Sequence, residues 1–568
     1  MSRTGISDTI IQASLAECVQ TKDEFLRFKR KLANAAGVRI PPTSVLRRAY
    51  EAYVAADETL RSPVLEKILT RRDVRSMSGV AIVTVLTKPY ACPGKCVYCP
   101  TESIMPKSYL TNEPAAMRAL MNRFDPWKQV ATRLKALSEN GHATDKIELI
   151  VKGGTWSAYP WDYQQWFIKR CFDACNAFRA GVKREERKEK RTYSLATSQR
   201  VNESAEHRVI GITLETRPDW ITPKEIVRLR TLGCTRVELG VQSVNDAILT
   251  VTKRGHDVAS VVDAARLLKD AGYKTDFHMM PQLPGATPRS DLADLRTIFD
   301  DQRFRPDMIK IYPCVTVELA ELHSWWKDGR YKPYADKKLV EMLIAAKTYV
   351  PRYCRISRLI RDIPSTSIVA GNMVTNLRQV VQAKMKERGL TCACLRCREI
   401  GRAAQTDPTL AEEIPTLFDD RYEASGGEEH FLSFEDGRRR AVFGFCRLRL
   451  PSFAPPSPRL RRAGKASDGT PARPEGDVGL LWDAIPEIRG AAFIRELHTY
   501  GTLVPIASHD PDASQHKGLG RRLMAEAERI AKASGYRTLA VISGVGVRAY
   551  YRKLGYRLRG TYMLKTLR

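Results

Sequence analysis

Short apolar runs of strand length recur along the middle of the chain, and each is followed by a polar or helical segment such as VVDAARLLKDAG. Continuous runs of β-branched residues are typical of parallel strands that are buried on both faces. The runs are VAIVTVLTKP, KIELIVKGGT, RVIGITLETRP, TRVELGVQS, KTDFHMMPQLPG and DMIKIYP. This alternation predicts an α/β fold with a full or partial (β/α) barrel of the TIM type over residues 78–390. Its chemistry is expected at the carboxyl ends of the strands.

The pattern on either side of the barrel predicts two further parts. Residues 1–77 have apolar positions at helical spacing and are expected to form a basic helical segment. Residues 391–425 are expected to be a connector, and residues 426–568 a second α/β domain. Within that domain, the stretch at 451–477 is rich in proline, glycine and arginine, which predicts a mobile linker.

Charge narrows the choice of partner. The 568 residues include 93 lysines and arginines against 64 acidic residues, a formal net charge of +29. An excess of this size favours a polyanion such as a nucleic acid, because neutralising phosphates yields affinity. We expect Lys29, Arg30 and Lys31 of the helical segment to contact RNA. The chain has no apolar run long enough to cross a bilayer and does not begin like a signal peptide, so we expect a cytoplasmic protein without a membrane partner.

Six of the thirteen cysteines fall into two tight groups, which are Cys92, Cys96 and Cys99, and Cys392, Cys394 and Cys397. In a reducing compartment such groups indicate metal binding rather than disulfides. The first group directly follows a predicted strand, and three thiolates can hold three irons of a cubane cluster and leave the fourth iron open. A zinc knuckle would need a fourth ligand nearby, and residues 80–141 contain no other cysteine or histidine.

The second cysteine group favours a structural zinc ion that joins two domains. Its fourth ligand would come from elsewhere in the chain, with Cys354, His323 and His430 as candidates. A reduced group without metal is the alternative.

Polar and glycine residues at the carboxyl ends of the predicted strands are candidate ligands of a small molecule. Gly153 and Gly154 would let the backbone approach a ligand closely, although a double glycine is also a common turn. The other candidates are Glu215, Arg217, Gln242, His278, Lys310 and Tyr312, each of which has an equally plausible structural role.

The stretch QHKGLG opens a predicted helix in the second domain. Glycines at a helix N-terminus expose backbone N–H groups, and the helix dipole adds positive potential, so the site suits a pyrophosphate. The residues of this loop pattern are Gln515, Gly518 and Gly520.

The two signatures resemble those of known enzymes. The cysteine spacing is similar to that of radical S-adenosylmethionine (SAM) enzymes, and QHKGLG is similar to the acetyl-CoA loop of GNAT acetyltransferases. Together they resemble the elongator complex protein 3 family over nearly the full chain. The segments that carry this resemblance are CVYCP, SYLTNEPAAMRAL, FDPW, GITLETRPDW, GCTRVELGVQSV, RGH, HMMPQLPG, FRPDMIKIYP, RELHTYG, QHKGLGRRLMAEAERIA and SGVGVRAYYRKLGYRL.

The resemblance implies a tRNA-modifying enzyme that acts on the wobble uridine of the anticodon stem–loop. Its cofactors would be a [4Fe–4S] cluster and SAM, with acetyl-CoA as co-substrate. A 5′-deoxyadenosyl radical would take hydrogen from the acetyl methyl group, the carbon radical would add to carbon 5 of the uracil, and hydrolysis would leave a carboxymethyl group. Elongator-type accessory subunits or further copies of the chain would be its partners.

The resemblance also assigns residues. Cys92, Cys96 and Cys99 would hold the cluster, and Gly153 and Gly154 would meet the methionine end of SAM. The residues expected at acetyl-CoA are Lys146, Glu496, Leu497, His498, Thr499, Leu519, Gly520, Arg521, Arg522 and Tyr551. The catalytic candidates are Tyr551 and His498, together with Lys310 and Tyr312. Lys310 and Tyr312, like the cofactor candidates Glu215 and Gln242, are proposed from their positions at strand ends and not from the resemblance.

Three features depart from the family pattern. The loop between Cys92 and Cys96 is short, and the linker at 451–477 is long. Lys152 stands where an apolar residue is expected, and it would touch SAM, pair with Glu148 or face outward.

Two other functions are compatible with these domains. One is a protein lysine acetyltransferase with a structural iron–sulfur cluster, but the basic charge argues against histone tails as substrates. The other is a non-catalytic tRNA-binding scaffold, against which the intact cysteine triad and QHKGLG argue.

Overall fold

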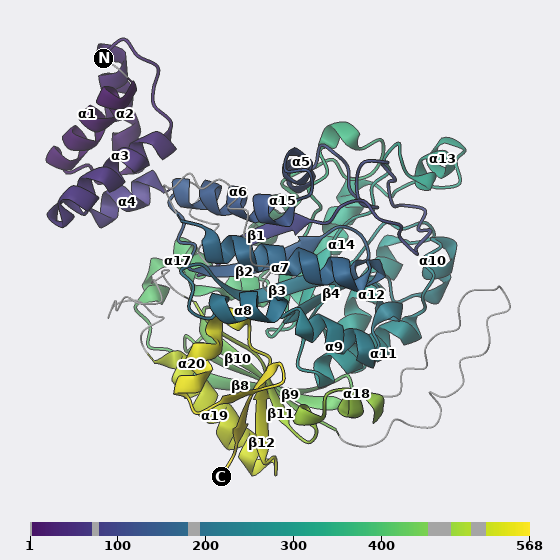
Figure 1. Ribbon diagram of the computed structural model, residues 1–568. Helices are drawn as coiled ribbons and strands as arrows, with labels where there is room; N and C mark the ends of the chain where they lie inside the picture. Colours follow the sequence, from purple (N-terminus) through teal and green to yellow (C-terminus); the bar gives the residue numbers. More distant parts are fainter. Residues whose placement is uncertain (1–2, 71–78, 180–193, 453–478, 501–517) are drawn as a thin grey trace.

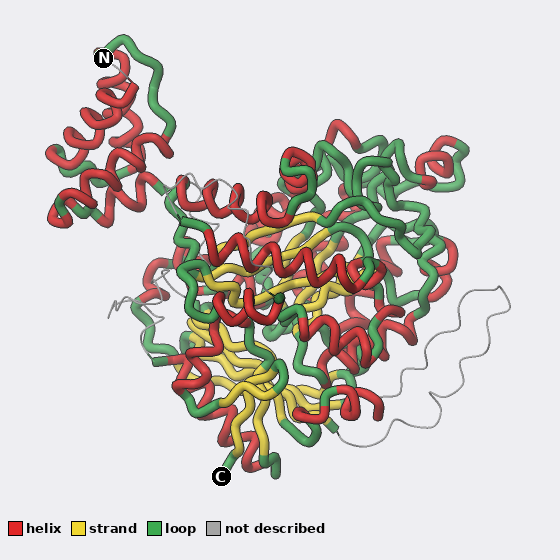
Figure 2. Tube along the Cα trace, viewed as in Figure 1, coloured by secondary structure: helices red, strands yellow, loops and turns green. Residues whose placement is uncertain are grey.

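The computed structural model describes residues 3–70, 79–179, 194–452, 479–500 and 518–568, in three successive parts (Figure 1). The first is a helical bundle, and the other two each contain a seven-stranded sheet. Figure 2 shows the strands of these sheets in yellow. Gln515 and residues 453–477 of the expected linker lie outside these ranges. Within them, no helix combines the length and apolar character that crossing a bilayer requires.

The amino-terminal bundle has a core of its own and stands apart from the rest of the molecule (Figure 1). Its helices are α1 (Arg3–Ala16), α2 (Lys22–Ala35), α3 (Thr43–Ala56) and α4 (Pro63–Leu69). A capping box, in which the Thr21 side chain accepts from the Glu24 backbone, begins α2. Contacts between α3 and α6 (Pro126–Glu139) join the bundle to the barrel.

One basic residue of α2 does not lie where its neighbours do. Phe25, Lys29 and Ala33 are spaced four apart and form the buried face of the helix, whereas Arg30 and Lys31 are exposed. Burial lowers the pKa of Lys29. Lys29 therefore does not share the exposed surface of Arg30 and Lys31.

The central part is a curved, entirely parallel sheet in which the strands neighbour one another in chain order. The strands are β1 (Ala81–Leu86), β2 (Lys146–Lys152), β3 (Arg208–Thr216), β4 (Arg236–Gln242), β5 (Lys274–Met279), β6 (Met308–Ile311) and β7 (Arg355–Arg358). Because β1 and β7 are the two edges of the sheet, the barrel is partial, as predicted.

Helices cover the outer face of this sheet (Figure 1). They and the helices of the following connection are α5 (Pro114–Met121), α6, α7 (Trp161–Ala177), α8 (Leu195–Asn202), α9 (Pro223–Thr231), α10 (Asp246–Val251), α11 (Val258–Asp270), α12 (Pro288–Asp300), α13 (Glu321–Lys327), α14 (Asp336–Tyr349), α15 (Leu377–Glu387), α16 (Leu395–Arg398) and α17 (Ile400–Thr406).

The inner face of the barrel is polar, whereas the sequence predicts strands that are apolar on both faces. In β2, Ile147, Leu149 and Val151 are buried in the apolar core. Lys146, Glu148 and Lys152 alternate with them and occupy the opposite face. Side chains of β2, β4 and β6 meet only inside a curved sheet, and Lys152, Glu238 and Lys310 do meet. The barrel interior therefore holds ionisable groups.

The third part is a mostly antiparallel sheet of order β13-β14-β12-β11-β10-β9-β8, in which only β11 and β12 pair in parallel. Its strands are β8 (Thr416–Ala424), β9 (Gly427–Glu435), β10 (Val442–Pro451), β11 (Ala492–Thr499), β12 (Thr538–Val541), β13 (Arg557–Arg559) and β14 (Tyr562–Thr566), and its helices are α18 (Gly479–Ala484), α19 (Leu519–Ala533) and α20 (Arg548–Lys553). Since β8 begins at Thr416, this sheet uses residues from the stretch that was expected to be a connector.

The second sheet packs against the amino ends of the barrel strands, and one apolar core continues through both parts. A Cβ on Gly544, after β12, would lie 1.9 Å from the carbonyl oxygen of Ile210 in β3, so only glycine permits this approach. Arg449 pairs with Asp270 across the same interface at 2.5 Å. The first cysteine group follows the carboxyl end of β1, so the two predicted chemistries lie at opposite ends of the barrel.

Candidate functional site

The loop after β1 brings Cys92, Cys96 and Cys99 to the carboxyl end of the barrel. Cys96 is buried, and the Arg254 guanidinium donates to its sulfur from 3.4 Å. A hydrogen bond from Cys99, helped by Arg254, lowers the pKa of Cys96 to about 4. This environment favours a thiolate, the form that ligates iron.

The space between these thiols fits an iron–sulfur cluster. A Cβ on Gly94 would lie 3.4 Å from the sulfur of Cys96, 3.7 Å from that of Cys92 and 2.8 Å from Arg217 Nη1. Within the part of the chain that the structure describes, Arg217 Nη1 and Arg254 Nε are buried without a hydrogen-bond partner. Three thiols and two buried cations with unused donors suit an anionic, thiolate-ligated group.

The double glycine lies at the adjacent strand end, after β2. Gly153 and Gly154 have φ values of +131° and +80°. The carbonyl of Gly153 accepts from Thr87 at 3.1 Å and from Tyr159 at 3.0 Å, and a Cβ there would collide with Thr87. A Cβ on Gly154 would meet only the Lys107 carbonyl, at 3.8 Å. Gly153 is thus needed for the fold, and Gly154 leaves room for a ligand.

A cluster of ionisable side chains lies inside the barrel at the same end. Glu238 is fully buried and accepts hydrogen bonds from Lys152, Lys310 and, at 2.9 Å, His278. Glu215 pairs with Lys152 at 2.8 Å and with His278 at 3.3 Å. Lys152 therefore joins two acidic residues of the interior, and neither Glu148 nor the outer surface is its partner.

Burial and the charges of neighbouring side chains together shift the pKa values in this cluster. Burial lowers the pKa of Lys310 to about 8, against the attraction of Glu238. Burial alone would raise the pKa of Glu215, but Lys152 and His278 hold it below its ordinary value. Glu215, Glu238 and His278 have ligand atoms close enough to bind a metal cation. The ammonium groups of Lys152 and Lys310 already supply the positive charge that such a cation would bring.

Three further predicted residues surround this cluster. Tyr312 lies edge-on to His278, with ring centroids 5.5 Å apart. Gln242 ends β4 with a φ of +74°, and its buried Oε1 has no hydrogen-bond partner among the described residues. Arg217 is held by Asp219 at 2.8 Å and by the Gly255 carbonyl at 2.9 Å. The structure thus gathers the predicted strand-end residues around one end of the barrel.

The predicted acetyl-CoA residues form a second group where β11 ends and α19 begins. Glu496, Leu497, His498 and Thr499 are all half-buried, and Glu496 accepts from Arg447 at 2.9 Å. Gly518 caps α19 with a φ of +71°, and a Cβ added there would meet no atom of the described residues within 4 Å. A Cβ on Gly520 would lie 3.0 Å from the Tyr550 hydroxyl.

The other members of this group are placed as follows. Arg521 and Arg522 are exposed on the first turn of α19, and Leu519 is buried. Tyr551 is buried in α20, edge-on to Tyr550, and burial raises its pKa. Lys146 begins β2 on the inner face of the barrel, at the end that the second sheet covers. These positions suit a site shared by the two parts, and Gln515 lies outside the described residues.

The second cysteine group is also compact. Ligand atoms of Cys392, Cys394 and Cys397 lie within 4.8 Å of one another, and Lys347 lies 3.9 Å from the Cys397 sulfur. Hydrogen bonds from Cys392 and Cys397 hold the pKa of Cys394 well below its ordinary value. Of the three candidate fourth ligands, His430 is engaged by Asp419 and Glu428, both at 2.8 Å, and His323 stacks on Trp326.

Sequence reasoning missed several residues of these sites. Glu238 is an acid inside the apolar run TRVELG, which is itself a signal that a strand carries a buried charge. Arg254 and Tyr550 lie within the quoted segments RGH and AYYRKLG, but only the fold shows what they contact.

Comparison with known proteins places both signatures in families. Residues 87–295 match the Radical SAM superfamily, residues 306–387 the Radical_SAM C-terminal domain and residues 506–556 the Acetyltransferase (GNAT) family. The tRNA uridine(34) acetyltransferase of Methanocaldococcus infernus is 42% identical over 557 residues, which are 96% of this chain and 95% of that protein. Elongator complex protein 3 of Homo sapiens is 36% identical, over 97% of this chain and 94% of that protein.

The chain belongs to the Elongator complex protein 3 family. A solved structure of the archaeal Methanocaldococcus infernus Elp3, with an N-terminus deletion (1-46), agrees with this assignment. It is 40% identical, has a TM-score of 0.68 and covers 86% of this chain and 100% of its own. The family assignment confirms the predicted combination of a radical SAM barrel and a GNAT domain. A radical SAM domain implies a [4Fe–4S] cluster and SAM, and the cysteine loop after β1 fits them.

Proposed function

We propose that this chain is a tRNA-modifying acyltransferase of the radical SAM type. It installs a carboxymethyl group at carbon 5 of the wobble uridine, using SAM and acetyl-CoA. The observation that carries the proposal is the pairing of a cysteine cradle and a GNAT fold across one continuous core. It is supported by the activity for which the Methanocaldococcus relatives are named, tRNA uridine(34) acetyltransferase.

At the carboxyl end of the barrel, Cys92, Cys96 and Cys99 would hold a [4Fe–4S] cluster. When bound, the cluster and SAM together supply the radical that removes hydrogen from the methyl group of acetyl-CoA. Arg254 stabilises the Cys96 thiolate, the unused donor of Arg217 would face the cluster, and Gly154 leaves room for the methionine end of SAM. Glu215, Gln242 and the Lys310–Glu238 pair would orient SAM and the uracil in a site that excludes water.

At the amino end, the first turn of α19 would bind the pyrophosphate of acetyl-CoA. The backbone N–H groups of Gly518, Leu519 and Gly520 and the side chains of Arg521 and Arg522 would supply positive potential there, since the backbone N–H groups of Arg521 and Arg522 already donate to the Gly518 carbonyl. His498 and Tyr551 would position the thioester, and Lys146 would contact it from the barrel.

The barrel interior connects these two ends. Lys146 and Lys152 are the first and last residues of β2, about 20 Å apart at roughly 3.3 Å per residue. The acetyl group must therefore travel along or past the interior, for which coenzyme A has a long flexible arm. The reaction would break one C–H bond of the acetyl methyl group and the C5–H bond of the uracil, and form a carbon–carbon bond between those two carbons. As the C5 proton leaves, one electron would return to the iron–sulfur cluster, and water would hydrolyse the thioester and release free coenzyme A.

The amino-terminal bundle would grip the tRNA backbone through Arg30 and Lys31, which are exposed. Phosphate contacts of this kind position the RNA, while a splayed-out anticodon base enters the barrel mouth.

The second cysteine group would bind a structural zinc ion through Cys392, Cys394 and Cys397, with Cys354 as the proposed fourth ligand. Cys354 is buried just before β7, and its carbonyl accepts from the Leu395 backbone N–H at 2.9 Å, so its backbone lies beside the cysteine loop. Its sulfur is not in the group of ligand atoms that lie within 4.8 Å of one another, so it would have to move toward them on binding the ion. Elemental analysis of the purified chain should find one zinc per chain in addition to iron, and a Cys394→Ser variant should lose zinc alone. Absence of zinc from the unaltered protein would contradict this site.

The function is tested by anaerobic reconstitution of the cluster, followed by addition of SAM, acetyl-CoA and tRNA and by mass analysis of the digested nucleosides. We expect a 5-carboxymethyl-type uridine, which should be absent with the Cys96→Ser variant. Acetylated protein with unmodified tRNA would instead favour a lysine acetyltransferase.

A further inference from the structure

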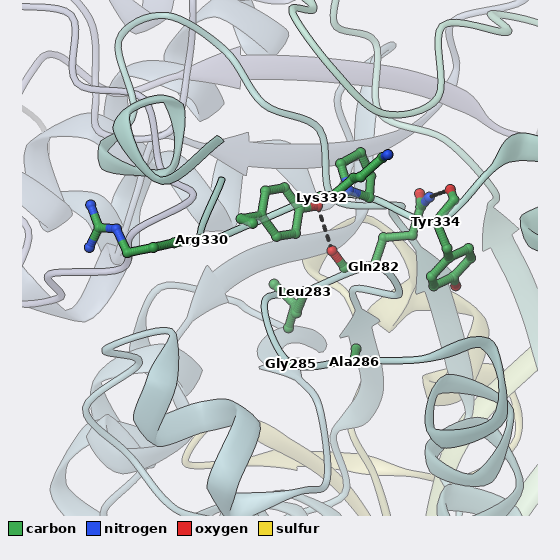
Figure 3. A pocket seen from close by; sticks show the side chains of 9 residues that line it. Gln282, Leu283, Gly285, Ala286, Arg330, Lys332 and Tyr334 are labelled. Atoms are coloured by element: carbon green, nitrogen blue, oxygen red, sulfur yellow. Dashed lines mark hydrogen bonds between the residues drawn. The ribbon is translucent and has the colours of Figure 1, made fainter. Parts of the chain in front are cut away.

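A cavity of about 170 Å³ lies beside the cysteine loop and plays no part in the sites described above. Its walls come from the loop after β5 and from the segment between α13 and α14, and Figure 3 shows both. The lining residues used below are Gln282, Leu283, Arg330, Tyr331, Lys332 and Tyr334.

The cavity opens at the same end of the barrel as the cysteine loop. Leu283 and Tyr331 pack in one apolar cluster with Cys96, Val97 and Tyr98. Leu322, in α13, donates its backbone N–H to the Val97 carbonyl at 2.8 Å. The α13 segment is therefore docked on the loop that would hold the cluster, on the side away from the second sheet (Figure 1).

The floor of the cavity is rigid. The backbone N–H of Gln282 donates to Asp291 at 2.8 Å, and the Tyr334 hydroxyl donates to the same carboxylate oxygen at 2.7 Å. The Tyr331 hydroxyl donates to the Gln282 carbonyl at 2.7 Å, and Gln282 itself has a φ of +67°. These bonds fix the Gln282 backbone, and its side chain points toward Tyr334 in Figure 3.

One acceptor in this floor is unused. Gln282 is 1% exposed, and its amide nitrogen donates to the Tyr334 carbonyl at 2.7 Å. Its Oε1 has no hydrogen-bond partner among the residues that the structure describes. Exchanging the amide atoms would set oxygen against the Tyr334 carbonyl, so the orientation is determined. A buried acceptor without a partner is costly, and a ligand with an N–H group would satisfy it.

The rim of the cavity is cationic and aromatic. Lys332 is exposed. Arg330 lies over the Trp325 ring at 5.1 Å and pairs with Asp328, both of which are largely exposed. An exposed ion pair contributes little, so a phosphate can compete with Asp328 for the guanidinium. Cations interleaved with aromatic rings are typical of single-stranded nucleic acid sites.

We propose that this cavity receives the base of an unpaired RNA nucleotide next to the reacting uridine, with one flanking phosphate on Arg330 and the other on Lys332, whose side chains point in opposite directions in Figure 3. The base donates an N–H to Gln282 Oε1 and lies against Tyr331. The volume is adequate, since a cavity of roughly 150 Å³ accommodates a benzene ring. This inference rests on the proposed function, because it assumes that the target uridine enters the neighbouring barrel mouth.

The test compares two double variants of the full-length, cluster-reconstituted protein. Arg330→Ala with Lys332→Ala removes two charges from the rim. Lys337→Ala with Lys338→Ala removes two exposed charges from the start of α14, which does not line the cavity, and is the matched control. The probe is an anticodon stem–loop RNA with an unmodified wobble uridine, and its affinity is measured over a range of salt concentrations. The rim variant should bind the RNA about tenfold more weakly, and the slope of its log affinity against log salt concentration should be smaller by about two. The control variant should change the affinity and the slope far less.

A second experiment tests the base rather than the phosphate. In the same RNA, 4-thiouridine replaces the nucleotide on either side of the wobble position, and the ultraviolet crosslink to unaltered protein is mapped by mass spectrometry. The inference predicts a crosslink from one neighbour to the peptides that contain Gln282 or Tyr331. Crosslinks that lie entirely elsewhere, or equal affinities for the rim and control variants, would overturn the inference while leaving the proposed function intact. An unaltered protein that does not bind the RNA would overturn both.

Discussion

The guanidinium of Arg495, in β11, donates to both carboxylate oxygens of Asp307, which precedes β6, at 2.5 and 2.8 Å, and both side chains are fully buried. Arg495 also pairs with Glu429 at 2.9 Å and donates to the Tyr273 carbonyl at 2.7 Å. A single side chain thus joins the second sheet to the amino ends of two barrel strands.

Arg495→Met should destabilise the whole chain, because it leaves Asp307 and Glu429 partly uncompensated in a buried interface. Loss of one partner of a buried ion pair costs about 3–5 kcal/mol. The urea midpoint of unfolding, followed by tryptophan fluorescence, measures the effect. Arg529→Met is the control, since Arg529 pairs with Glu526 on the exposed face of α19 and should leave the midpoint unchanged. Equal midpoints for the two variants would show that the interface does not depend on Arg495.

Gly94→Ala should impair cluster assembly without unfolding the barrel. The added Cβ would enter the space between the sulfurs of Cys92 and Cys96 and press on Arg217, which Asp219 holds in place. We expect cluster affinity to fall roughly tenfold, as for other changes around metal ligands. Iron content and absorbance after anaerobic reconstitution provide the measurement. Gly437→Ala, where an added Cβ meets nothing within 4 Å, should retain full iron content. A Gly94→Ala protein with as much iron would contradict the proposed cradle.

Activity should decline as the pH rises through about 8, because the Lys310 ammonium that neutralises buried Glu238 then loses its proton. One titrating group implies a rate that falls about tenfold per pH unit above that value. The native pKa lies below the ordinary value of 10.5, so between these pH values the unfolded chain binds more protons at this residue. Titration of Lys310 by itself therefore makes the free energy of unfolding rise with pH. The decline in activity cannot then be attributed to unfolding of the protein by deprotonation of Lys310.

The pH profile of uridine modification under saturating substrates measures this effect. Lys310→Arg keeps its charge and should move the decline to higher pH, whereas Lys310→Met should be slow throughout. A rate that stays constant from neutral pH to well above pH 8 would exclude Lys310 as the titrating group.

Within α2, exposed and buried basic residues should affect tRNA differently. Arg30→Ala with Lys31→Ala should weaken tRNA binding and reduce the slope of log affinity against log salt by about 2. Lys29→Met, on the buried face, should leave that slope unchanged. Filter binding at several salt concentrations distinguishes the two. If the double variant binds like the unaltered protein, the bundle does not contact tRNA through this face.

The barrel was predictable from sequence because its first six strands are apolar runs bounded by helical segments. Strand β7, with the sequence RISR, was missed because it is short and carries two arginines. Strands β8, β9 and β10 were also missed. Strand β8 is polar, and its residues are mostly exposed or half-buried. Strand β10 contains Arg447 and Arg449, which are buried. Arginine in a strand normally indicates a surface, and only the packing of the two sheets explains these buried ones.

The site was predictable where spacing alone carries the chemistry, as in the cysteine loop and QHKGLG. The pairing of Lys152 with Glu215 and Glu238 was not, because it joins three strands and depends on which face of each strand points inward. Lys29 shows the same limit, since composition marks it as basic and only helical phase shows that it is buried.

In the proposed reaction, the methyl group of acetyl-CoA gives up one hydrogen atom to a SAM-derived radical and then joins the uracil. Acetyl-CoA with a fully deuterated methyl group tests this directly, with the reconstituted protein, SAM and tRNA. One deuterium should appear in 5′-deoxyadenosine and two in the carboxymethyl group of the uridine. Modified uridine that retains all three deuterium atoms, or 5′-deoxyadenosine that contains none, would contradict the account.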